Sequence, residues 1–416
     1  MHVPPREELI RRVKALPAAA PLLAAVGSEP GLHLVGGAVR DLLLAGDEGG
    51  PEGGTPALDP GDLDLVAEGD VAALAPRLGG PYVLHERFGT ATVILNGNTY
   101  DLATARRETY AEPGALPDVA PATLHEDLLR RDFTVNAIAI TLGGPSAGEL
   151  TAAPRALEDL SAGRLRVLHD GSFIDDPTRL FRLVRYRSRL GFEVEPATLA
   201  LARAAVTGGA LGTVSGARIG AELRLLAGED DPVAAFAALG GLGLDRAFHP
   251  RFGLVDPALA RRALALLPPD GRRDVVALAL AAADVPRAEL RGLLDELAFD
   301  ADSRDRILAI TSGAEAMAKA LAAAGRPSEI AAAVGGGGVE LTAVAGALGP
   351  EDQAREWLER LRHVRLEIDG GDLIAAGVRE GPAVGQGLRA ALAAKLDGRA
   401  GGQESELAEA LRAAHG

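Results

Sequence analysis

Two aspartates, Asp62 and Asp64, alternate with leucine in the stretch DLDLV. On a β-strand the side chains of residues i and i+2 point to the same face, so we expect the two carboxylates to stand side by side. Like charges that close repel one another unless a cation lies between them, and hard carboxylate oxygens favour Mg²⁺. The pair therefore indicates a magnesium site of the kind that supports a two-metal displacement at a phosphate. An exposed edge strand with alternating leucines is the competing interpretation.

Asp101 lies in the later stretch TYDLATA, which also reads as a strand. If this strand neighbours the one that carries Asp64, a third carboxylate joins the pair. The alternative is an ordinary acidic residue at a strand end. The order of the strands in the sheet therefore decides whether Asp101 belongs to the predicted metal site.

A glycine pair, Gly36 and Gly37, separates an apolar stretch from a helical one in LVGGAVRDLLLAG. The free backbone N–H groups at a helix start, together with the helix dipole, favour an anion. Arg40 follows one turn later, and its forked guanidinium suits a phosphate. These residues predict a phosphate-binding turn, although most glycine pairs merely turn the chain.

Two further segments concentrate arginine. In LLRRDFTVNAIAI, Arg131 and Asp132 precede an apolar run, and a locally capped helix start is the alternative interpretation. In DDPTRLFRLVRYRSRLGF, an acidic residue and three arginines recur every three residues: Asp176, Arg179, Arg182 and Arg185. A helix would place them on one slowly drifting face, opposite a buried face formed by Leu180, Leu183, Val184 and Leu190. Such an arginine face suits triphosphate oxygens or base edges, or is simply solvated.

The elements that position these residues differ between the two parts of the chain. Short apolar or alternating stretches predict strands at residues 32–37, 62–68, 90–95, 99–105 and 137–142. Helices are expected at 38–45 and 71–78, a hairpin turn at 95–98, and loops at 46–61 and 108–127. From about Ser172 onward, helical periodicity predicts an all-α region.

Composition excludes several classes of site. The 416 residues contain no cysteine, which excludes thiolate zinc sites, disulfides and cysteine nucleophiles. We find no apolar run of transmembrane length and no signal peptide, so we expect a cytoplasmic protein with two to four domains. The net charge of −15 requires any nucleic-acid site to be a concentrated arginine patch.

In order and spacing, the motifs resemble those of the class II tRNA nucleotidyltransferases and the related bacterial poly(A) polymerases. That family opens with a G-G-x-V-R-D helix and a D-x-D strand, here GGAVRD and DLDLV. A D-x-x-x-x-R-x-E strand end, an R-R-D-F-T-x-N-A segment and an acid-D-x-x-R helix follow, here DLATARRE, RRDFTVNA and DDPTR. Residues 368–392 also resemble the family's C-terminal element.

The resemblance implies an α+β head with the polymerase-β-like nucleotidyltransferase fold and a small mixed sheet, followed by an all-α neck, body and tail. The expected boundaries are 1–145 for the catalytic head, 146–230 for the neck with a nucleotide-templating helix, 231–350 for the body and 351–416 for a tail that contacts tRNA. The implied enzyme adds CMP and AMP from CTP and ATP to the 3′ end of tRNA, depends on Mg²⁺ and needs no nucleic-acid template.

The resemblance also assigns roles to residues. Asp62 and Asp64 are expected to hold the metal, with Asp101 as a third catalytic carboxylate. Nucleotide contacts fall on Gly36, Gly37, Arg40, Arg131, Asp132, Asp176, Arg179, Arg182 and Arg185. Among these, Asp132 is expected near the ribose, and Asp176 with Arg179 is expected to read the edge of C or A.

Three positions depart from the family pattern. The spacer at residues 46–61 is longer than usual, which we interpret as a surface insertion. Asp175 stands where the family usually has glutamate. Ala217, in SGARIGAEL, replaces another glutamate, so support for the templating helix is expected to differ.

Other activities share these motifs. Addition of only CC, addition of only A, and poly(A) synthesis all use the same head, and we expect the short, proline-rich stretch 108–127 to govern the switch from C to A. A non-catalytic RNA-binding relative is less favoured because both aspartates are present. A metal-dependent phosphohydrolase of the HD type is excluded, because His169 and Asp170 have no upstream histidine at metal spacing.

We predict that Asp62→Ala and Asp64→Ala each abolish nucleotide transfer, because each removes a carboxylate from the proposed metal site. Magnesium-dependent incorporation of labelled nucleotide measures the loss, and circular dichroism confirms that the variants fold. Activity retained in either folded variant contradicts the metal assignment.

Overall fold

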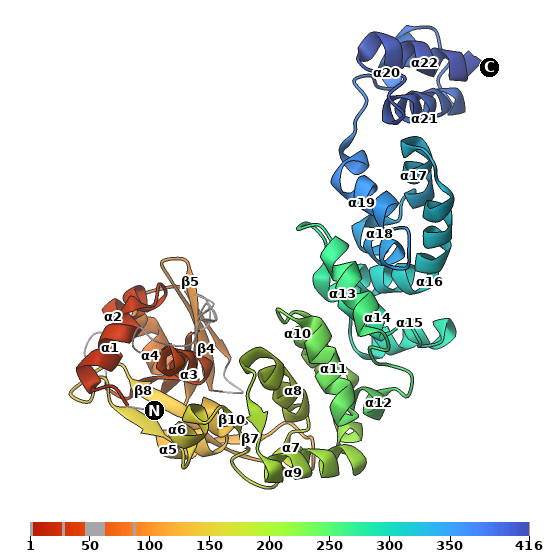
Figure 1. The fold of residues 1–416 in the computed structure, drawn as a ribbon. Helices are drawn as coiled ribbons and strands as arrows, with labels where there is room; N and C mark the ends of the chain where they lie inside the picture. Colours follow the sequence, from red (N-terminus) through yellow and green to blue (C-terminus); the bar gives the residue numbers. More distant parts are fainter. Residues whose placement is uncertain (1–2, 27–29, 46–62, 86–88, 416) are drawn as a thin grey trace. The chain divides into compact units, whose positions relative to one another are not determined.

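The computed structural model describes residues 3–26, 30–45, 63–85 and 89–415. The chain divides into two compact units, Met1–Ser215 and Gly216–Gly416 (Figure 1). Unit 1 combines a mixed sheet with helices, and unit 2 is helical in its described residues, so the predicted fold class is confirmed. The expected insertion at 46–61 and Asp62 lie outside the described residues. The four-domain division stays a prediction.

The main sheet of unit 1, as far as the chain is described, has the strand order β3-β4-β5-β2-β1-β8-β9. Its strands are β1 (Leu32–Val35), β2 (Leu63–Ala67), β3 (Tyr82–His85), β4 (Thr90–Leu95), β5 (Asn98–Thr104), β8 (Ile138–Thr141) and β9 (Leu150–Ala152). The pair β2 and β5 is parallel, and the other neighbours are antiparallel. Strands β1 and β8 are buried throughout, which places the core at the centre of the sheet.

Helices and short strands complete unit 1. They are α1 (Arg6–Ala15), α2 (Ala19–Val26), α3 (Gly37–Leu44), α4 (Val71–Leu74), η1 (Ala75–Leu78), α5 (Leu124–Leu129), η3 (Thr134–Asn136), α6 (Ala156–Ser161), β10 (Arg164–Leu165), α7 (Ser172–Asp175), α8 (Arg179–Leu190), β11 (Glu193–Val194), α9 (Pro196–Thr207) and η4 (Ala210–Thr213). Helix α3 packs against β1, β2 and β8, so the glycine turn lies directly above the buried strands.

The predicted strands and the hairpin are confirmed within the described residues. Strands β4 and β5 pair antiparallel up to Leu95 and Asn98. The two residues between them, Asn96 and Gly97, have φ angles of 50° and 83°, and positive φ at both central positions matches the twist of a hairpin. The sequence did not predict β3, a short edge strand with mostly exposed side chains.

The expected loop at residues 108–127 was wrong for much of its length. Strand β6 (Arg106–Thr109) pairs antiparallel with β7 (Asp118–Pro121), and α5 starts at Leu124. The start of α5 is fixed by a capping box in which Thr123 and Glu126 bond each other's backbone N–H groups. The polar and proline-rich composition hid a hairpin whose strands are short and largely exposed.

The predicted arginine helix starts later than expected. Asp176 is extended (φ −135°, ψ 92°) between α7 and α8, because the residue before a proline, here Pro177, is disfavoured in the α region. Leu180, Leu183 and Val184 are buried as predicted, whereas Leu190 is half-buried. Arg185 is only 7 % exposed, so the arginines do not form one solvated face.

Unit 2 continues with helices joined by short connections. They are α10 (Gly216–Ala227), α11 (Pro232–Leu242), α12 (Leu244–Phe248), α13 (Pro257–Leu266), α14 (Arg273–Ala281), α15 (Arg287–Glu296), α16 (Ala301–Ala323), α17 (Pro327–Val334), α18 (Gly338–Ala347), α19 (Glu351–Glu359), η5 (Leu361–His363), α20 (Gly370–Ala375), α21 (Pro382–Leu396) and α22 (Gln403–His415).

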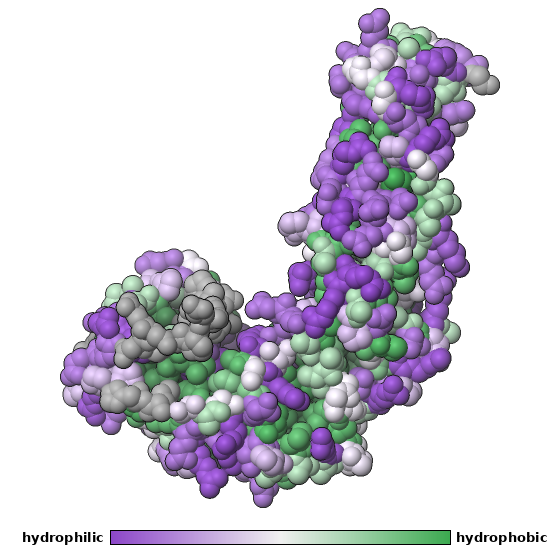
Figure 2. Space-filling model, viewed as in Figure 1, coloured by the Kyte–Doolittle hydropathy of each residue, from purple (hydrophilic) through white to green (hydrophobic). Residues whose placement is uncertain are grey.

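The last three helices of unit 2 enclose a small core of their own, formed by Ile368, Leu373, Val378, Ala391 and Ala410. In the view of Figure 2, the surface over α20–α22 is mostly hydrophilic. No single helix in the described ranges has the length and apolar character to cross a membrane, and α17 with α18 passes that test only as a pair bent by 112°.

Candidate active site

The motifs of unit 1 converge on a cavity of about 330 Å³, which we call the arginine cavity. Five arginines line it: Arg106, Arg130, Arg131, Arg179 and Arg182. Four acidic residues lie among them: Asp64, Glu108, Asp132 and Asp176. The planar arginine side chains favour phosphate oxygens, and the mixture of cations and carboxylates suits a ligand that also carries polar groups.

The glycine turn forms one wall of the arginine cavity. Gly36 has φ +74°, a conformation that glycine adopts without strain, and it caps the N-terminus of α3. A Cβ atom at Gly36 would lie 3.5 Å from Asp64 Oδ2 and 3.5 Å from Arg131 Nη1. The turn therefore brings the start of α3, whose first N–H groups have no partner within the helix, next to a carboxylate and a guanidinium from two other elements.

Arg40 lies behind this turn. Its side chain is 3 % exposed, and its Nε and Nη2 atoms donate to Asp41 at 2.7 and 2.9 Å. Its Nη1 atom donates to Asn136 Oδ1 at 2.7 Å. Neither Arg40 nor Arg185 is among the described residues that line the arginine cavity. The structure therefore places Arg40 where it supports η3.

Asp132 joins η3 to α8. Its Oδ1 atom accepts from Phe133 N and from Asn136 Nδ2, and its Oδ2 atom accepts from Arg182 Nε at 2.7 Å. The same oxygen lies 2.6 Å from Arg182 Nη2 in an ion pair. Burial alone raises the pKa of Asp132, but Arg182 and the hydrogen bonds outweigh it and lower the pKa. Asp132 is therefore a buried anion that fixes the orientation of Arg182.

Asp127 fixes the orientation of two further arginines, Arg130 and Arg131 of RRDFTVNA. Its carboxylate is 0 % exposed and accepts from Arg130 Nε at 2.9 Å and from Arg131 Nη2 at 3.0 Å. Burial raises the pKa of Asp127, but the two guanidinium groups outweigh it, so the pKa lies below its ordinary value. The α5 carboxylate thus directs two arginines to the cavity from one side.

Asp176 and Arg179 meet at the start of α8. Asp176 Oδ1 accepts from the backbone N–H of Thr178 at 3.1 Å and from its hydroxyl at 2.7 Å. Arg179 donates from Nη1 to Ser172 Oγ and from Nη2 to the carbonyl of Arg130, both at 2.7 Å. The predicted base-reading pair is thus held in place by its own backbone and by neighbouring segments, and both residues line the cavity.

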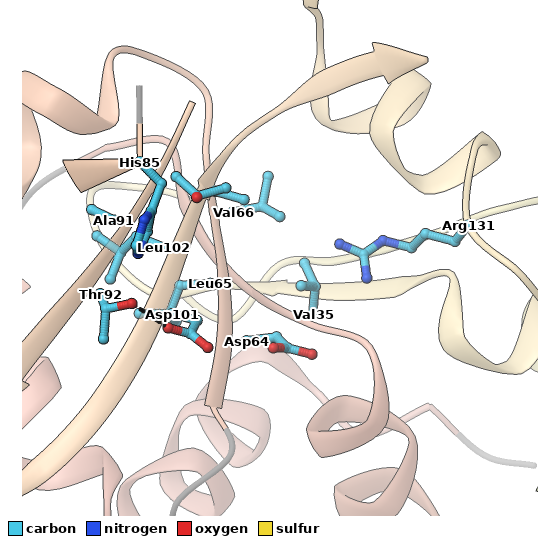
Figure 3. Close-up of a pocket in the computed structure, with 12 residues that line it drawn as sticks. Val35, Asp64, Leu65, Val66, His85, Ala91, Thr92, Asp101, Leu102 and Arg131 are labelled. Atoms are coloured by element: carbon cyan, nitrogen blue, oxygen red, sulfur yellow. Dashed lines mark hydrogen bonds between the residues drawn. The ribbon is translucent and has the colours of Figure 1, made fainter. Parts of the chain in front are cut away.

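A second cavity, of about 390 Å³, lies against the strands β2, β4 and β5, and we call it the strand cavity. Asp64 and Asp101 lie directly opposite each other in the parallel register of β2 and β5. Thr92 Oγ1 donates to Asp101 Oδ1 at 2.9 Å, and both carboxylates point to the same side of the sheet (Figure 3). Asp64 and Arg131 line both cavities, so they mark the junction between them.

The predicted metal site is only partly described. Asp62 lies outside the described residues, and within the described ranges no group of three or more His, Cys, Asp or Glu side chains is placed to hold a metal ion. Asp64 and Asp101 are both exposed, and their carboxylate oxygens are hard donors. The donors present therefore fit Mg²⁺ in chemical type.

Several cavity residues have no role in the sequence prediction. Glu108 accepts from Arg106 Nε at 3.1 Å, from Arg130 Nη1 at 2.7 Å and from the Tyr110 hydroxyl at 2.9 Å. Burial, followed by the charge of Glu108, raises the pKa of Tyr110, which keeps its hydroxyl protonated. Arg106 and Glu108 belong to the motif DLATARRE, which was the available signal. Arg130 and Tyr186 also line the cavity and were also given no role by the sequence prediction.

Comparison with known proteins identifies the unit that carries this site. Residues 32–166 match the poly A polymerase head domain. The region that carries the site is similar to the head domain of the tRNA nucleotidyltransferase and poly(A) polymerase family. The matched residues include the glycine turn, the strands β2 and β5 that carry Asp64 and Asp101, and the buried Asp127 and Asp132.

Named relatives of this head domain differ in product. An A-adding tRNA nucleotidyltransferase of Halalkalibacterium halodurans is 46 % identical over 50 % of this chain and 48 % of its own length. A CC-adding tRNA nucleotidyltransferase of Deinococcus radiodurans is 42 % identical over 52 % of this chain and 55 % of its own length. The chain therefore spans about half the length of the curated relatives it matches.

A solved structure matches along nearly the whole chain. The Thermotoga maritima CCA-adding enzyme complexed with tRNA_CCA is 26 % identical, with a TM-score of 0.76, and the match covers 99 % of each chain. The fold of the head region together with the helical region thus occurs in a solved CCA-adding enzyme.

The buried Asp127 predicts a specific response to acid. Because its folded-state pKa is lowered, its stabilisation is complete above the unfolded-state value of about 3.9 and is lost as the pH falls through the folded-state value. We expect Asp127→Asn to lower the free energy of unfolding of unit 1 at pH 7 by about 3 kcal/mol, since the half-buried Arg130 and Arg131 both lose the charge of a buried carboxylate. The difference from wild type should shrink towards pH 3.

Urea denaturation followed by tyrosine absorbance measures this effect, because all four tyrosines lie in unit 1. Asp118→Asn, at an exposed position of β7, is the matched control and should behave as wild type at both pH values. A stability difference for Asp127→Asn that has the same size at pH 7 and pH 3 contradicts the assignment.

Proposed function

We propose that this chain adds nucleotides from CTP and ATP to the 3′ end of tRNA without a nucleic-acid template. The observation that carries the proposal is the junction of the two cavities at Asp64 and Arg131. One cavity has the arginines that a nucleoside triphosphate requires, and the other lies beside two carboxylates on an open strand surface. The proposed substrate also implies a cytoplasmic enzyme.

The incoming nucleotide is proposed to occupy the arginine cavity. Its phosphates lie against the N-terminus of α3 beyond Gly36 and Gly37, where backbone N–H groups and the helix dipole favour an anion. Arg131, beside Gly36, adds a cation to the same phosphates. Arg40 contributes by holding Asn136, since its own hydrogen bonds go to protein groups.

Selection of the base is proposed to occur at the start of α8. Asp176 accepts a hydrogen bond from the amino group of C or A, and Arg179 and Arg182 donate to ring or carbonyl acceptors. The support is their common position in the arginine cavity and the number of hydrogen bonds that hold each of them. A rigid set of side chains replaces a template strand because its donor and acceptor pattern is fixed before the nucleotide binds.

Mg²⁺ is proposed to bind Asp62 and Asp64, and Asp101 lies opposite Asp64 on the neighbouring strand. When bound, the metal supplies charge stabilisation at the transferring phosphate and lowers the pKa of the attacking hydroxyl. The acceptor 3′-hydroxyl lies in the strand cavity, where Asp101 is oriented by its hydrogen bond from Thr92. The chain's own residues thus bring the hydroxyl, the α-phosphate and the metal ligands to one point.

Addition of the whole CCA end is the product we propose, in keeping with the solved enzyme that matches along the full chain. Addition of A alone is the second candidate, because the relative with 46 % identity is named an A-adding enzyme. Both products require the same head, so they are distinguished by which acceptor ends the chain extends.

Incorporation of CTP and ATP, each supplied separately with Mg²⁺, into tRNAs ending at the discriminator base, at C and at CC tests this proposal. Addition of C to the first two ends and of A to the third supports CCA addition. Addition of A to the CC end alone supports the A-adding candidate. Absence of incorporation at all three ends contradicts the proposed function.

A further inference from the structure

Tyr186 has no part in the proposed chemistry, yet three arginines surround its ring. The guanidinium carbons of Arg40, Arg182 and Arg185 lie 5.5, 5.7 and 5.8 Å from the ring centroid. Tyr186 is 9 % exposed and lines the arginine cavity. The ring therefore lies between Arg40 of α3 and Arg182, one of the arginines proposed to contact the base.

Aromatic residues of the core also fix the orientation of this ring. Phe133, which is 0 % exposed, packs against it edge-to-face, with centroids 5.8 Å apart and planes at 88°. Phe133 in turn contacts Phe173 at 6.5 Å. Because this aromatic cluster belongs to the core, the Tyr186 ring cannot turn away from the arginines without opening a cavity.

The grouping of three cations is compensated locally. Asp41 accepts from Arg40 and Asp132 accepts from Arg182, which offsets the repulsion between those two guanidinium groups. The negative face of an aromatic ring attracts cations, and the attraction is stronger where water is excluded. Tyr186 therefore supplies attraction at the place where the arginines converge.

Arg182 is held by Tyr186 at two points. Its Nη2 atom donates to the Tyr186 hydroxyl at 3.2 Å, and its guanidinium lies over the ring. Asp132 holds the Nε side of the same group at 2.7 Å. Together, the carboxylate, the hydroxyl and the ring determine the plane of the guanidinium, and that plane determines which base edge it can address.

We propose that Tyr186 is a positioning residue that orients Arg182 and thereby sets the discrimination between CTP and ATP. The effect on discrimination between CTP and ATP rests on the proposed function. The orientation of Arg182 by Tyr186 can be measured without any activity.

Two variants separate the ring from the hydroxyl. On each acceptor end, Tyr186→Leu should reduce the ratio of kcat/KM between the correct and the incorrect nucleotide by about tenfold, mainly through KM. Tyr186→Phe keeps the ring and should stay within about threefold of wild type. Tyr82→Phe, at an exposed position of β3, is the matched control and should retain wild-type discrimination.

Wild-type discrimination in Tyr186→Leu, or a fall in kcat with unchanged KM values, overturns the proposal. An inactive wild type contradicts the proposed function instead. In that case, or if Tyr186→Leu does not fold, NMR tests the orientation of Arg182 directly. The measurement compares proton exchange at the arginine side chains between Tyr186→Phe and wild type. Exchange should become several-fold faster at Arg182, which loses a hydrogen bond, and stay unchanged at Arg40, which contacts only the ring. Unchanged exchange at Arg182 overturns the proposal.

Discussion

A buried carboxylate, Asp132, holds together three elements that are far apart in the sequence. It accepts from Asn136 in η3, which accepts from Arg40 in α3, and it binds Arg182 in α8. Removing Arg182 would cost about 3–5 kcal/mol, because the Asp132 carboxylate would stay buried without a compensating charge. This constraint explains why the glycine turn and the arginine helix meet at one cavity.

Buried carboxylates also explain how an acidic chain can form a cavity lined by arginines. The chain carries a net charge of −15, yet five arginines line one cavity. Buried carboxylates such as Asp127 and Asp132 hold several of these arginines in place before any ligand binds. A polyanionic ligand therefore meets a prepared set of donors, and little reorganisation is needed at binding.

Local patterns in the sequence were sufficient for five strands of the main sheet (β1, β2, β4, β5 and β8), the β4–β5 turn and the α+β class. They also predicted that Asp101 joins Asp64 if their two strands are neighbours in the sheet. The parallel pairing of β2 with β5 makes them neighbours. They did not reveal that Arg40 and Arg185 are buried, because the partners that determine burial lie elsewhere in the chain: Asn136 is 96 residues from Arg40. The β6–β7 hairpin was missed for a related reason, since its pairing depends on contacts that polar composition does not show.

Calorimetric titration of CTP into the wild type and into Asp132→Asn tests most directly whether this buried anion maintains the nucleotide cavity. The variant keeps the size and part of the hydrogen bonding of the side chain but removes its charge. We predict that CTP binds at least about tenfold more weakly to Asp132→Asn, because Arg182 loses its counterion and its fixed orientation, while the circular dichroism spectrum stays that of wild type. Equal affinities of the two proteins for CTP would contradict the account.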